Sequence, residues 1–332
     1  MSAEQTRIAV VIPCYKVTRQ IAGVLARIGP EVWRIYCVDD RCPEASGDFI
    51  ERTANNPRVI VLRHAANQGV GGAVVTGYQR AIADGAEIVV KIDGDGQMDP
   101  GLIPLFVRPI AAGLADYTKG NRFYNLAGLR DMPGVRVLGN AVLSFFAKIS
   151  SGYWDVFDPT NGYTAIHAAV LAELRLDRLA RRFFFESDML FRLNLLRAVV
   201  LDVPMRGIYG DETSNLRIAR VIPSFLGRSA VNFMKRIVYN YFVHDFNLAS
   251  LEMIVGTALL LFGTIFGLSE WIHLSRVNRV ASAGTVMVAA LPVIAGLQLL
   301  LAAIGIDIQS VPRTPLHPRL LALRPRAEAA AT

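Results

Sequence analysis

The chain has 332 residues, a formal net charge of +7 and 52% hydrophobic residues, a length that suits one large domain or two smaller ones. No segment resembles a nucleic-acid-binding module, so the positive charge does not indicate a nucleic-acid partner. The three cysteines, Cys14, Cys37 and Cys42, are odd in number and lack metal-site spacing, which fits a reducing compartment. The polar start MSAEQTRIAV runs directly into an apolar segment, so we expect no signal peptide.

Four apolar, β-branched runs predict strands at residues 8–12, 33–38, 59–62 and 88–92. Helical stretches lie between these runs, and the alternation predicts an α/β fold with a parallel sheet. Three of the four runs end in polar residues. Ligands of open α/β sheets bind beyond the carboxyl ends of the strands, so we expect the functional site at that edge.

The stretch KIDGDGQMDP at 91–100 follows the fourth predicted strand. Asp93 and Asp95 alternate along the chain, so an extended backbone would send both side chains to the same side. Together with the amide oxygen of Gln97 they form a set of hard-oxygen ligands that suits Mg²⁺ or Mn²⁺. Asp and Gly are also ordinary turn formers, so these residues alone leave a simple polar turn open.

The stretch NQGVGGA at 67–73 follows the third predicted strand and opens a helix. Glycines at a helix N-terminus can bring backbone N–H groups to a phosphate. A dinucleotide-binding fingerprint belongs after the first strand instead, and there the chain has Pro13-Cys14-Tyr15 without a glycine loop. We therefore do not predict a dinucleotide-binding fold.

Two long apolar segments, at 248–271 and 280–306, are each long enough to cross a bilayer as a helix. A buried helix of a soluble domain is the alternative for the first segment. The link between them is short, so we predict a hairpin with both chain ends on one side of the membrane. Lysines and arginines flank the open end of this hairpin, which places that end in the cytoplasm. Residues 216–247 alternate cations with apolar and aromatic residues. They predict helices lying on the membrane surface, with an ordinary amphipathic helix on a soluble core as the alternative.

These patterns divide the chain into four parts. We predict a cytoplasmic domain at 1–215, amphipathic juxtamembrane helices at 216–247, two transmembrane helices at 248–306 and a basic cytoplasmic tail at 307–332.

Seven short motifs lie between residues 11 and 188. They are VIPCY at 11–15, VDD at 38–40, NQG at 67–69, DGDGQ at 93–97, GNRF at 120–123, DPTNGY at 158–163 and FESD at 185–188. In order and spacing they resemble family 2 glycosyltransferases and, with the hairpin, the polyprenyl-phosphate branch that includes dolichyl-phosphate mannose synthase. The resemblance extends over nearly the whole chain up to residue 306.

The resemblance implies a GT-A fold, a Rossmann-like and mostly parallel sheet. It further implies an inverting, metal-dependent hexosyltransferase at the cytoplasmic face of the inner membrane. The donor would be a nucleoside-diphosphate sugar, and the acceptor a polyprenyl phosphate of the undecaprenyl or dolichyl type. The resemblance leaves the sugar, the base and a homo-oligomeric state open.

Residue roles follow from the same resemblance. The nucleotide sugar would be bound by Pro13, Tyr15, Asp39, Asp40, Asn67, Gly69 and Asp93. A Mg²⁺ or Mn²⁺ ion bridging the diphosphate would be held by Asp93, Asp95 and Gln97. That ion would neutralise the charge that grows on the departing diphosphate.

The acceptor is expected to need cations more than a base, because a phosphate monoester is mostly ionised near neutral pH. Arg122 and Arg136 match family arginines that bind the acceptor phosphate, with pairing to a nearby acid such as Asp131 as the alternative. Asp158 would orient the acceptor or take up a residual proton. Glu186 and Asp188 are second candidates for that task, with a helix N-terminal charge as the alternative for both.

Two positions depart from the family pattern. Lys16-Val17 stands where Asn-Glu is frequent, and Ser214-Asn215 stands where a Ser-Lys pair is frequent.

Three other functions are alternatives to the one that the resemblance implies. A processive polysaccharide synthase would carry Gln-x-x-Arg-Trp and more membrane spans, and a sugar nucleotidyltransferase would carry a glycine- and arginine-rich loop after the first strand. A non-catalytic, membrane-anchored nucleotide-sugar-binding partner would be expected to lose Asp93, Asp95, Gln97 and Arg122, which are all present.

Overall fold

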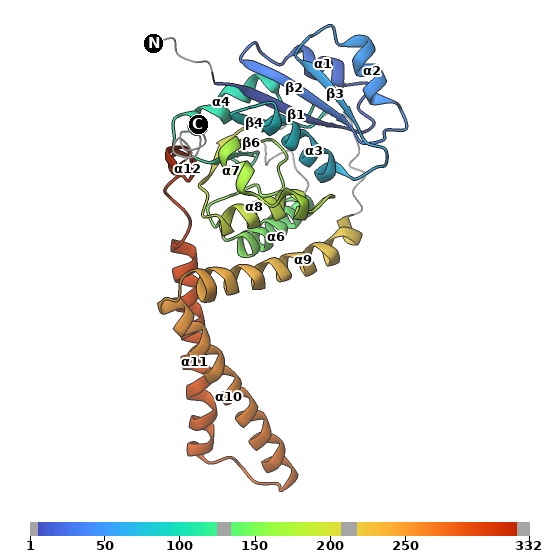
Figure 1. Cartoon of the computed structure of the whole chain (residues 1–332). Coiled ribbons are helices and arrows are strands. Elements are labelled where there is room, and N and C mark those ends of the chain that lie inside the picture. Colours follow the sequence, from blue (N-terminus) through green and yellow to red (C-terminus); the bar gives the residue numbers. More distant parts are fainter. Residues whose placement is uncertain (1–5, 125–133, 207–217, 324–332) are drawn as a thin grey trace. The chain divides into compact units, whose positions relative to one another are not determined.

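A computed structural model describes residues 6–124, 134–206 and 218–323, without the side chains of residues 134–138, 140 and 218–222. The chain divides into two compact units. The first comprises Met1–Phe233 with Pro312–Thr332, and the second comprises Met234–Val311. Figure 1 follows the chain through both units by colour.

One seven-stranded sheet forms the centre of the first unit, in the order β3-β2-β1-β4-β6-β5-β7 within the described residues. The strands are β1 (Ile8–Cys14), β2 (Val32–Asp39), β3 (Val59–Arg63), β4 (Ile88–Lys91), β5 (Tyr117–Asn121), β6 (Thr164–His167) and β7 (Val200–Pro204). β6 runs antiparallel to both of its neighbours, and the remaining pairs are parallel. The predicted α/β class with a mostly parallel sheet is confirmed, and the four predicted strands correspond to β1–β4.

Helices cover both faces of this sheet because side chains alternate along each strand. Val10 and Ile12 of β1 belong to a core shared with α1 and α4, whereas Val11 faces α3, where Gly77 lets the helix approach closely. A Cβ at Gly77 would lie 2.3 Å from Val11. The helices that cover the two faces are α1 (Ile21–Ala26), α2 (Ser46–Thr53), α3 (Val70–Ala83), the 3₁₀ turn η1 (Pro100–Leu102) and α4 (Ile103–Ala111).

The three strands β5, β6 and β7 were not predicted from the sequence. They are four or five residues long, and β5 reads YTKGN, with a lysine at its centre. Lys119 is nevertheless completely buried. Short strands with buried charges lack the apolar signature on which strand prediction depends.

A smaller cluster joins three further helices, the last of which continues past Phe233 into the second unit. They are α6 (Gly134–Ser151), α8 (Phe185–Leu195) and α9 (Ile218–Val238). Ala147, Phe184 and Phe225 form its core, and the rings of Phe184 and Phe225 meet edge to face with centroids 5.1 Å apart. The connecting elements α7 (Ala168–Glu173) and η2 (Leu176–Arg178) lie between β6 and α8.

The segment after the predicted membrane hairpin returns to the first unit, where it forms α12 (His317–Leu323). The completely buried carboxylate of Asp116 accepts hydrogen bonds from the backbone N–H groups of Leu316 and His317 and lies 2.8 Å from His317 Nδ1. The His317 ring also stacks on His167 with centroids 4.3 Å apart. Residues 312–323 are therefore anchored to the domain that precedes the hairpin.

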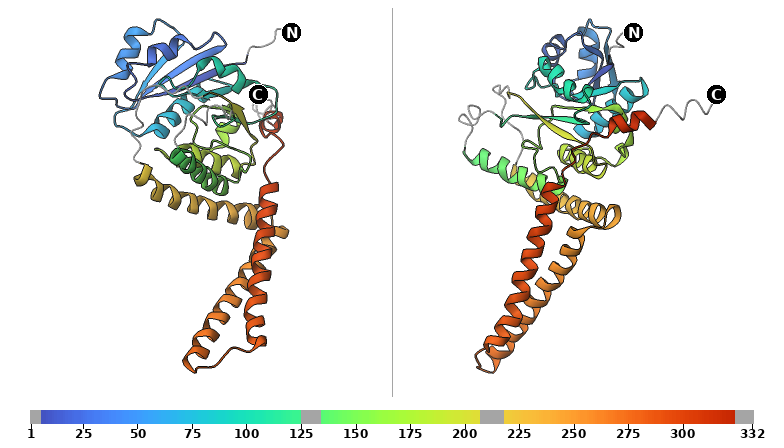
Figure 2. Two further views of the ribbon diagram at one scale, coloured as in Figure 1. Left: turned by 180° about the vertical axis from the view of Figure 1, so that it is seen from behind. Right: turned by 90° about the vertical axis from the view of Figure 1, so that its left-hand side faces the viewer.

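The second unit contains α10 (Leu248–Arg276) and α11 (Ala283–Gln309), with mean hydropathies of 2.0 and 2.3, preceded by a π-helical turn (Tyr239–His244). Figure 2 shows α10 and α11 side by side in both of its views. Small residues allow the two backbones to approach, since a Cβ at Gly263 would lie 2.6 Å from the carbonyl oxygen of Ala289. At the open end, buried Arg236 pairs with Asp307 at 2.6 and 3.0 Å. By length and composition both helices qualify as membrane spans.

Candidate active site

The acidic turn after β4 lies at the carboxyl edge of the parallel strands. Asp93 is part-exposed, and its Oδ1 lies 2.9 Å from Nζ of Lys91, which is buried. The Asp95 carboxylate accepts a hydrogen bond from the backbone N–H of Gln97 at 3.0 Å. Asp93, Asp95 and Gln97 are all intermediate in exposure, so the turn presents its oxygen atoms where a ligand has access to them.

The donor set of this turn fits a hard divalent cation. Two carboxylates and an amide oxygen are the ligand types that Mg²⁺ and Mn²⁺ take. Among the described residues no group of three His, Cys, Asp or Glu side chains is arranged to enclose a metal ion. The turn would accordingly supply part of a coordination shell, and the oxygen atoms of a bound ligand would supply the rest.

Lys91, the last residue of β4, is a buried cation beside this turn. Its Nζ lies 3.1 Å from Glu186 Oε1 as well as 2.9 Å from Asp93. Burial acts to lower the pKa of Lys91, but the two carboxylates outweigh it and raise this pKa above its ordinary value. Lys91 is therefore charged at neutral pH and fixes one oxygen of Asp93.

Asp39 and Asp40, at the end of β2, organise the loops around them. Asp39 accepts backbone hydrogen bonds from Cys42 and Gly47, both at 2.7 Å. Asp40 accepts hydrogen bonds from the backbone of Gln68 and Gly69 at 2.8 and 2.7 Å. Any contact of these carboxylates with a nucleotide would be made in addition to these bonds.

The glycine-rich start of α3 packs against the chain at residues 180–182. Asn67 donates to the carbonyl oxygen of Asp40 at 3.1 Å, and Gly69 has a φ of +85°, which favours glycine. A Cβ at Gly71 would lie 2.3 Å from the carbonyl oxygen of Ala180, and the Gly71 N–H donates to Arg181 O at 2.9 Å. These glycines therefore serve the close packing of α3 against residues 180–182.

Pro13 and Tyr15 flank the same edge from β1. Pro13 pairs in register with Val38 of β2, and the Tyr15 side chain is 46% exposed. Lys16, which stands at a position that departs from the family pattern, has a φ of +59°. Tyr15 is thus an exposed aromatic ring beside the loops that Asp39 and Asp40 hold.

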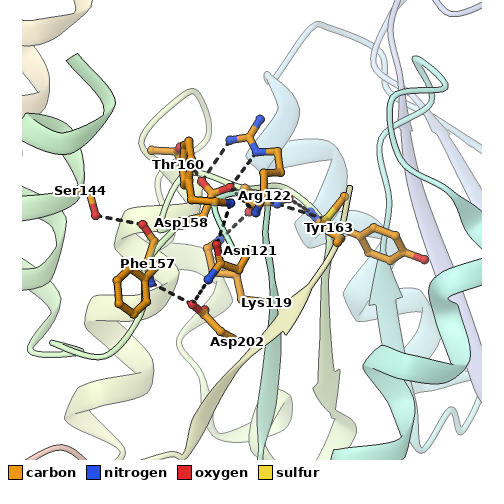
Figure 3. Close-up of polar contacts among 12 residues, drawn as sticks. Lys119, Asn121, Arg122, Ser144, Phe157, Asp158, Thr160, Tyr163 and Asp202 are labelled. Carbon is orange, nitrogen blue, oxygen red and sulfur yellow. Dashed lines mark hydrogen bonds and ion pairs between the residues drawn. The ribbon is translucent and has the colours of Figure 1, made fainter. Parts of the chain in front are cut away.

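Arg122 and Asp158 form a bidentate ion pair. Arg122 Nε lies 2.7 Å from Asp158 Oδ2, and Arg122 Nη2 lies 3.1 Å from Oδ1. The Asp158 side chain is 1% exposed and that of Arg122 29%. Figure 3 shows the two side chains pointing toward each other. Two residues that the motifs assigned separately to the acceptor are therefore brought together as one unit.

Arg136 lies near the start of α6, and its side chain is outside the described residues, as is the whole of Asp131. The expectation that Arg136 docks an acceptor phosphate stays a prediction.

Glu186 and Asp188 both lie in the first turn of α8 but face different partners. Glu186 reaches Lys91 and so joins the acidic turn. Asp188 accepts hydrogen bonds from the Ala180 backbone at 3.0 Å, from Arg192 at 3.0 Å and from Asn232 of α9 at 3.2 Å. Asp188 therefore ties three elements together, whereas Glu186 lies within the site.

Four side chains in or beside the candidate site were assigned no role from the sequence: Lys91, Lys119, Asn161 and Asp202. All four lie in or beside short strands and are wholly or largely buried. A usable signal was the lysine inside each of two otherwise buried strands, since a buried ammonium group must be paired.

The sequence matches a known family over residues 9–175, half of the chain, and the description of that family is "Glycosyl transferase family 2". The chain therefore belongs to the family 2 glycosyltransferases.

Curated relatives extend the comparison. The chain is 33% identical over 154 residues to the UDP-N-acetylglucosamine–dolichyl-phosphate N-acetylglucosaminyltransferase of Methanococcus voltae, which covers 46% of this chain and 61% of that protein. It is 28% identical over 203 residues to the undecaprenyl-phosphate mannosyltransferase of Micrococcus luteus, covering 60% of this chain and 82% of that protein. The chain thus spans less than two thirds of the first relative and most of the second.

Among solved structures the chain resembles glucosyl-3-phosphoglycerate synthase from Mycobacterium tuberculosis, determined in complex with Mn²⁺, uridine diphosphate and phosphoglyceric acid. The TM-score is 0.51 at 16% sequence identity, with 70% of this chain and 78% of that chain covered. This similarity confirms the predicted GT-A fold.

Proposed function

We propose that the protein transfers a sugar from a nucleoside-diphosphate sugar to a polyprenyl phosphate at the cytoplasmic face of a membrane, with inversion at the anomeric carbon. The observation that carries this proposal is a single short turn, residues 158–162. At one end of it Asp158 pairs with Arg122. At the other end a Cβ on Gly162 would lie 2.6 Å from Asp93 Oδ2 and 2.5 Å from Lys91 Nζ. The groups suited to a diphosphate and those suited to a phosphate monoester are therefore adjacent.

The donor half of the site is assigned to the acidic turn. Asp93, Asp95 and Gln97 would hold Mg²⁺ or Mn²⁺, with Lys91 fixing Asp93 in place. When bound, such a cation neutralises the charge that develops on a departing diphosphate. Tyr15 and the loops held by Asp39 and Asp40 would receive the base and ribose.

The acceptor half is assigned to Arg122 and Asp158, with Arg136 as a further cation. A guanidinium group binds two phosphate oxygens as readily as two carboxylate oxygens. An arriving lipid phosphate would therefore compete with Asp158 for Arg122. Asp158 would then be free to orient the acceptor or to take up its residual proton.

The membrane assignment of this proposal is supported by α10 and α11. The two spans are followed by residues 312–323, which bind to the same domain that precedes α10. A chain that leaves and rejoins one domain must cross a membrane an even number of times, as a hairpin does. The lysines and arginines at the open end favour the cytoplasm for that domain.

Radiolabelled UDP- and GDP-sugars, incubated with Mn²⁺ and membranes that contain undecaprenyl phosphate, test the proposed function directly. We expect one donor to label a lipid product that carries a single sugar. Metal-dependent donor binding without any labelled lipid would favour a non-catalytic binding partner, and a labelled polymer would favour a processive synthase. Either result would overturn the proposal.

A further inference from the structure

Lys119 of β5 is a buried cation attached to the backbone of the turn that carries Asp158. Its side chain is fully buried, and Nζ donates to the carbonyl oxygen of Asn161 at 2.5 Å. Asn161 in turn donates to Asp158 Oδ2 at 3.3 Å and accepts the N–H of Tyr163 at 2.9 Å. Any movement of Lys119 is therefore transmitted to Asp158 through one residue.

Asp202 of β7 holds the other end of the same turn. Its Oδ2 accepts hydrogen bonds from the backbone N–H of Phe157 at 2.9 Å and from Asn121 at 3.0 Å. Its Oδ1 is buried and has no hydrogen-bond partner among the described residues. Figure 3 shows Lys119, Asn121 and Asp202 below the Arg122–Asp158 pair. Two ionisable groups from neighbouring strands thus bracket residues 157–163.

A buried ammonium group is costly, because it loses several kcal/mol of hydration that its partners must replace. An apolar side chain of similar length would fill the same space without that cost. The charged groups that face Lys119 are Glu186 of α8, Asp158 of the turn, Lys91 of β4 and Asp202 of β7. Burial lowers the pKa of Lys119 to about 8, although the carboxylates act to raise it. Its charge is therefore lost just above neutral pH.

We propose that Lys119 is a positioning residue whose ammonium group fixes the turn at 157–163 and thereby orients the Asp158 carboxylate toward Arg122. The anchoring itself follows from the contacts alone. Only its consequence for turnover rests on the proposed function.

The test compares full-length wild type, Lys119→Met and a control, Arg175→Met, which removes an exposed cation of the same domain. Hydrogen exchange at neutral pH should be roughly tenfold faster at residues 157–163 in Lys119→Met, and unchanged at residues 39–47. Turnover on polyprenyl phosphate should fall roughly 10- to 100-fold, while the affinity for UDP with Mn²⁺ changes less than about twofold. Arg175→Met should match wild type in all three measurements.

A pH profile separates positioning from mere packing. Wild-type turnover should decline above about pH 8, and this decline should be missing in Lys119→Met. Asp202→Asn removes a charge that raises the Lys119 pKa, so it should move the decline to lower pH. This second variant also keeps the proposal testable if Lys119→Met does not fold.

The outcomes are distinct for the two proposals. Wild-type exchange at 157–163 in Lys119→Met, or an unmoved decline in Asp202→Asn, overturns the positioning role. If exchange is faster in Lys119→Met but the wild-type protein labels no lipid, the anchoring is supported and the proposed function is overturned instead.

Discussion

At the scale of single residues, the site is defined by buried charges that satisfy one another. Lys91 bridges Asp93 and Glu186, and Arg122 pairs with Asp158. Removing one member of such a pair leaves the other buried and uncompensated, which costs roughly 3–5 kcal/mol. The effect of a mutation at one of these positions must therefore be interpreted together with the mutation of its partner.

Asp95→Ala should abolish sugar transfer and leave the fold intact, because Asp95 is part-exposed and a ligand of the proposed cation. Transfer assays together with thermal melting measure both effects. Asp48→Ala, an exposed acid on the same domain, should retain full turnover. Full wild-type activity in a chelator would contradict the prediction.

Arg122→Ala should lower acceptor turnover by orders of magnitude, and it should also destabilise the domain, because buried Asp158 loses its partner. The double variant Arg122→Ala/Asp158→Asn should recover much of the stability without recovering turnover. Melting temperatures and lipid saturation curves separate the two effects. Donor affinity, measured by calorimetry with Mn²⁺, should stay unchanged. If donor affinity falls and lipid saturation does not change, Arg122 belongs to the diphosphate side.

Asp202→Asn should change the pH dependence of stability. Burial raises the pKa of Asp202 to about 6, so between about pH 4 and 6 the folded protein holds a proton that the unfolded chain has released. The stability of the wild type therefore falls as the pH rises from about 4 to 6. The variant lacks this titration, so above this window it should gain on the order of 1–2 kcal/mol relative to wild type. Melting temperatures of the detergent-solubilised proteins from pH 4 to 7 measure this gain, and a constant difference across that range would contradict it.

At the scale of elements, the site is assembled from the ends of strands that are far apart in sequence. The acidic turn follows β4, Lys119 lies in β5, and Arg122 comes directly after β5. Antiparallel β6 lies between β4 and β5 in the sheet. The turn at 157–163 leads into β6 and so reaches both neighbours. This explains why one short loop contacts Asp93 at one end and Arg122 at the other.

Truncation after Val311 removes α12 and leaves Asp116 without its bonds to Leu316 and His317. Hydrogen bonds to a buried carboxylate contribute roughly 1.5–3 kcal/mol each. The melting temperature of the catalytic domain should therefore fall by several degrees. His317→Ala, which keeps the backbone bonds, should show a smaller decrease. An unchanged melting temperature after truncation would mean that α12 does not stabilise the domain.

At the scale of the whole molecule, the chain combines a GT-A domain with two helices long and apolar enough to span a membrane. A lipid acceptor with a long apolar tail suits such an anchor. Because α12 belongs to the first unit, a truncation that removes the membrane hairpin also removes α12 from that unit.

Truncation after Phe246 should retain UDP binding but turn over long-chain polyprenyl phosphate poorly, while a short, water-soluble polyprenyl phosphate is used nearly normally. The Val311 truncation serves as the matched control, because it lacks α12 but keeps both spans. The difference between the two truncations in turnover on the long lipid measures the contribution of the hairpin. Equal turnover would mean that the hairpin only localises the enzyme.

Local sequence composition was sufficient to predict some of the strands and helices of this protein. The β-branched runs predicted β1–β4, because fully buried parallel strands are continuously apolar. The long charge-free segment that became α11 was recognised for a related reason, since its length and composition alone meet the requirement for a span. The ordered motifs identified the family, and the polar residues at the strand ends predicted the edge of the sheet at which the candidate site lies.

Only the tertiary structure decided which of these residues meet. The pairing of Arg122 with Asp158, the bridge from Lys91 to Glu186 and the return of α12 to Asp116 join positions 36, 95 and 201 residues apart. Strands β5–β7 were missed because they are only four or five residues long and two of them carry a charged residue near the centre, so no continuous apolar run marks them in the sequence. Sequence records which groups are available, whereas the partner of a buried charge is selected by the folded arrangement that must neutralise it.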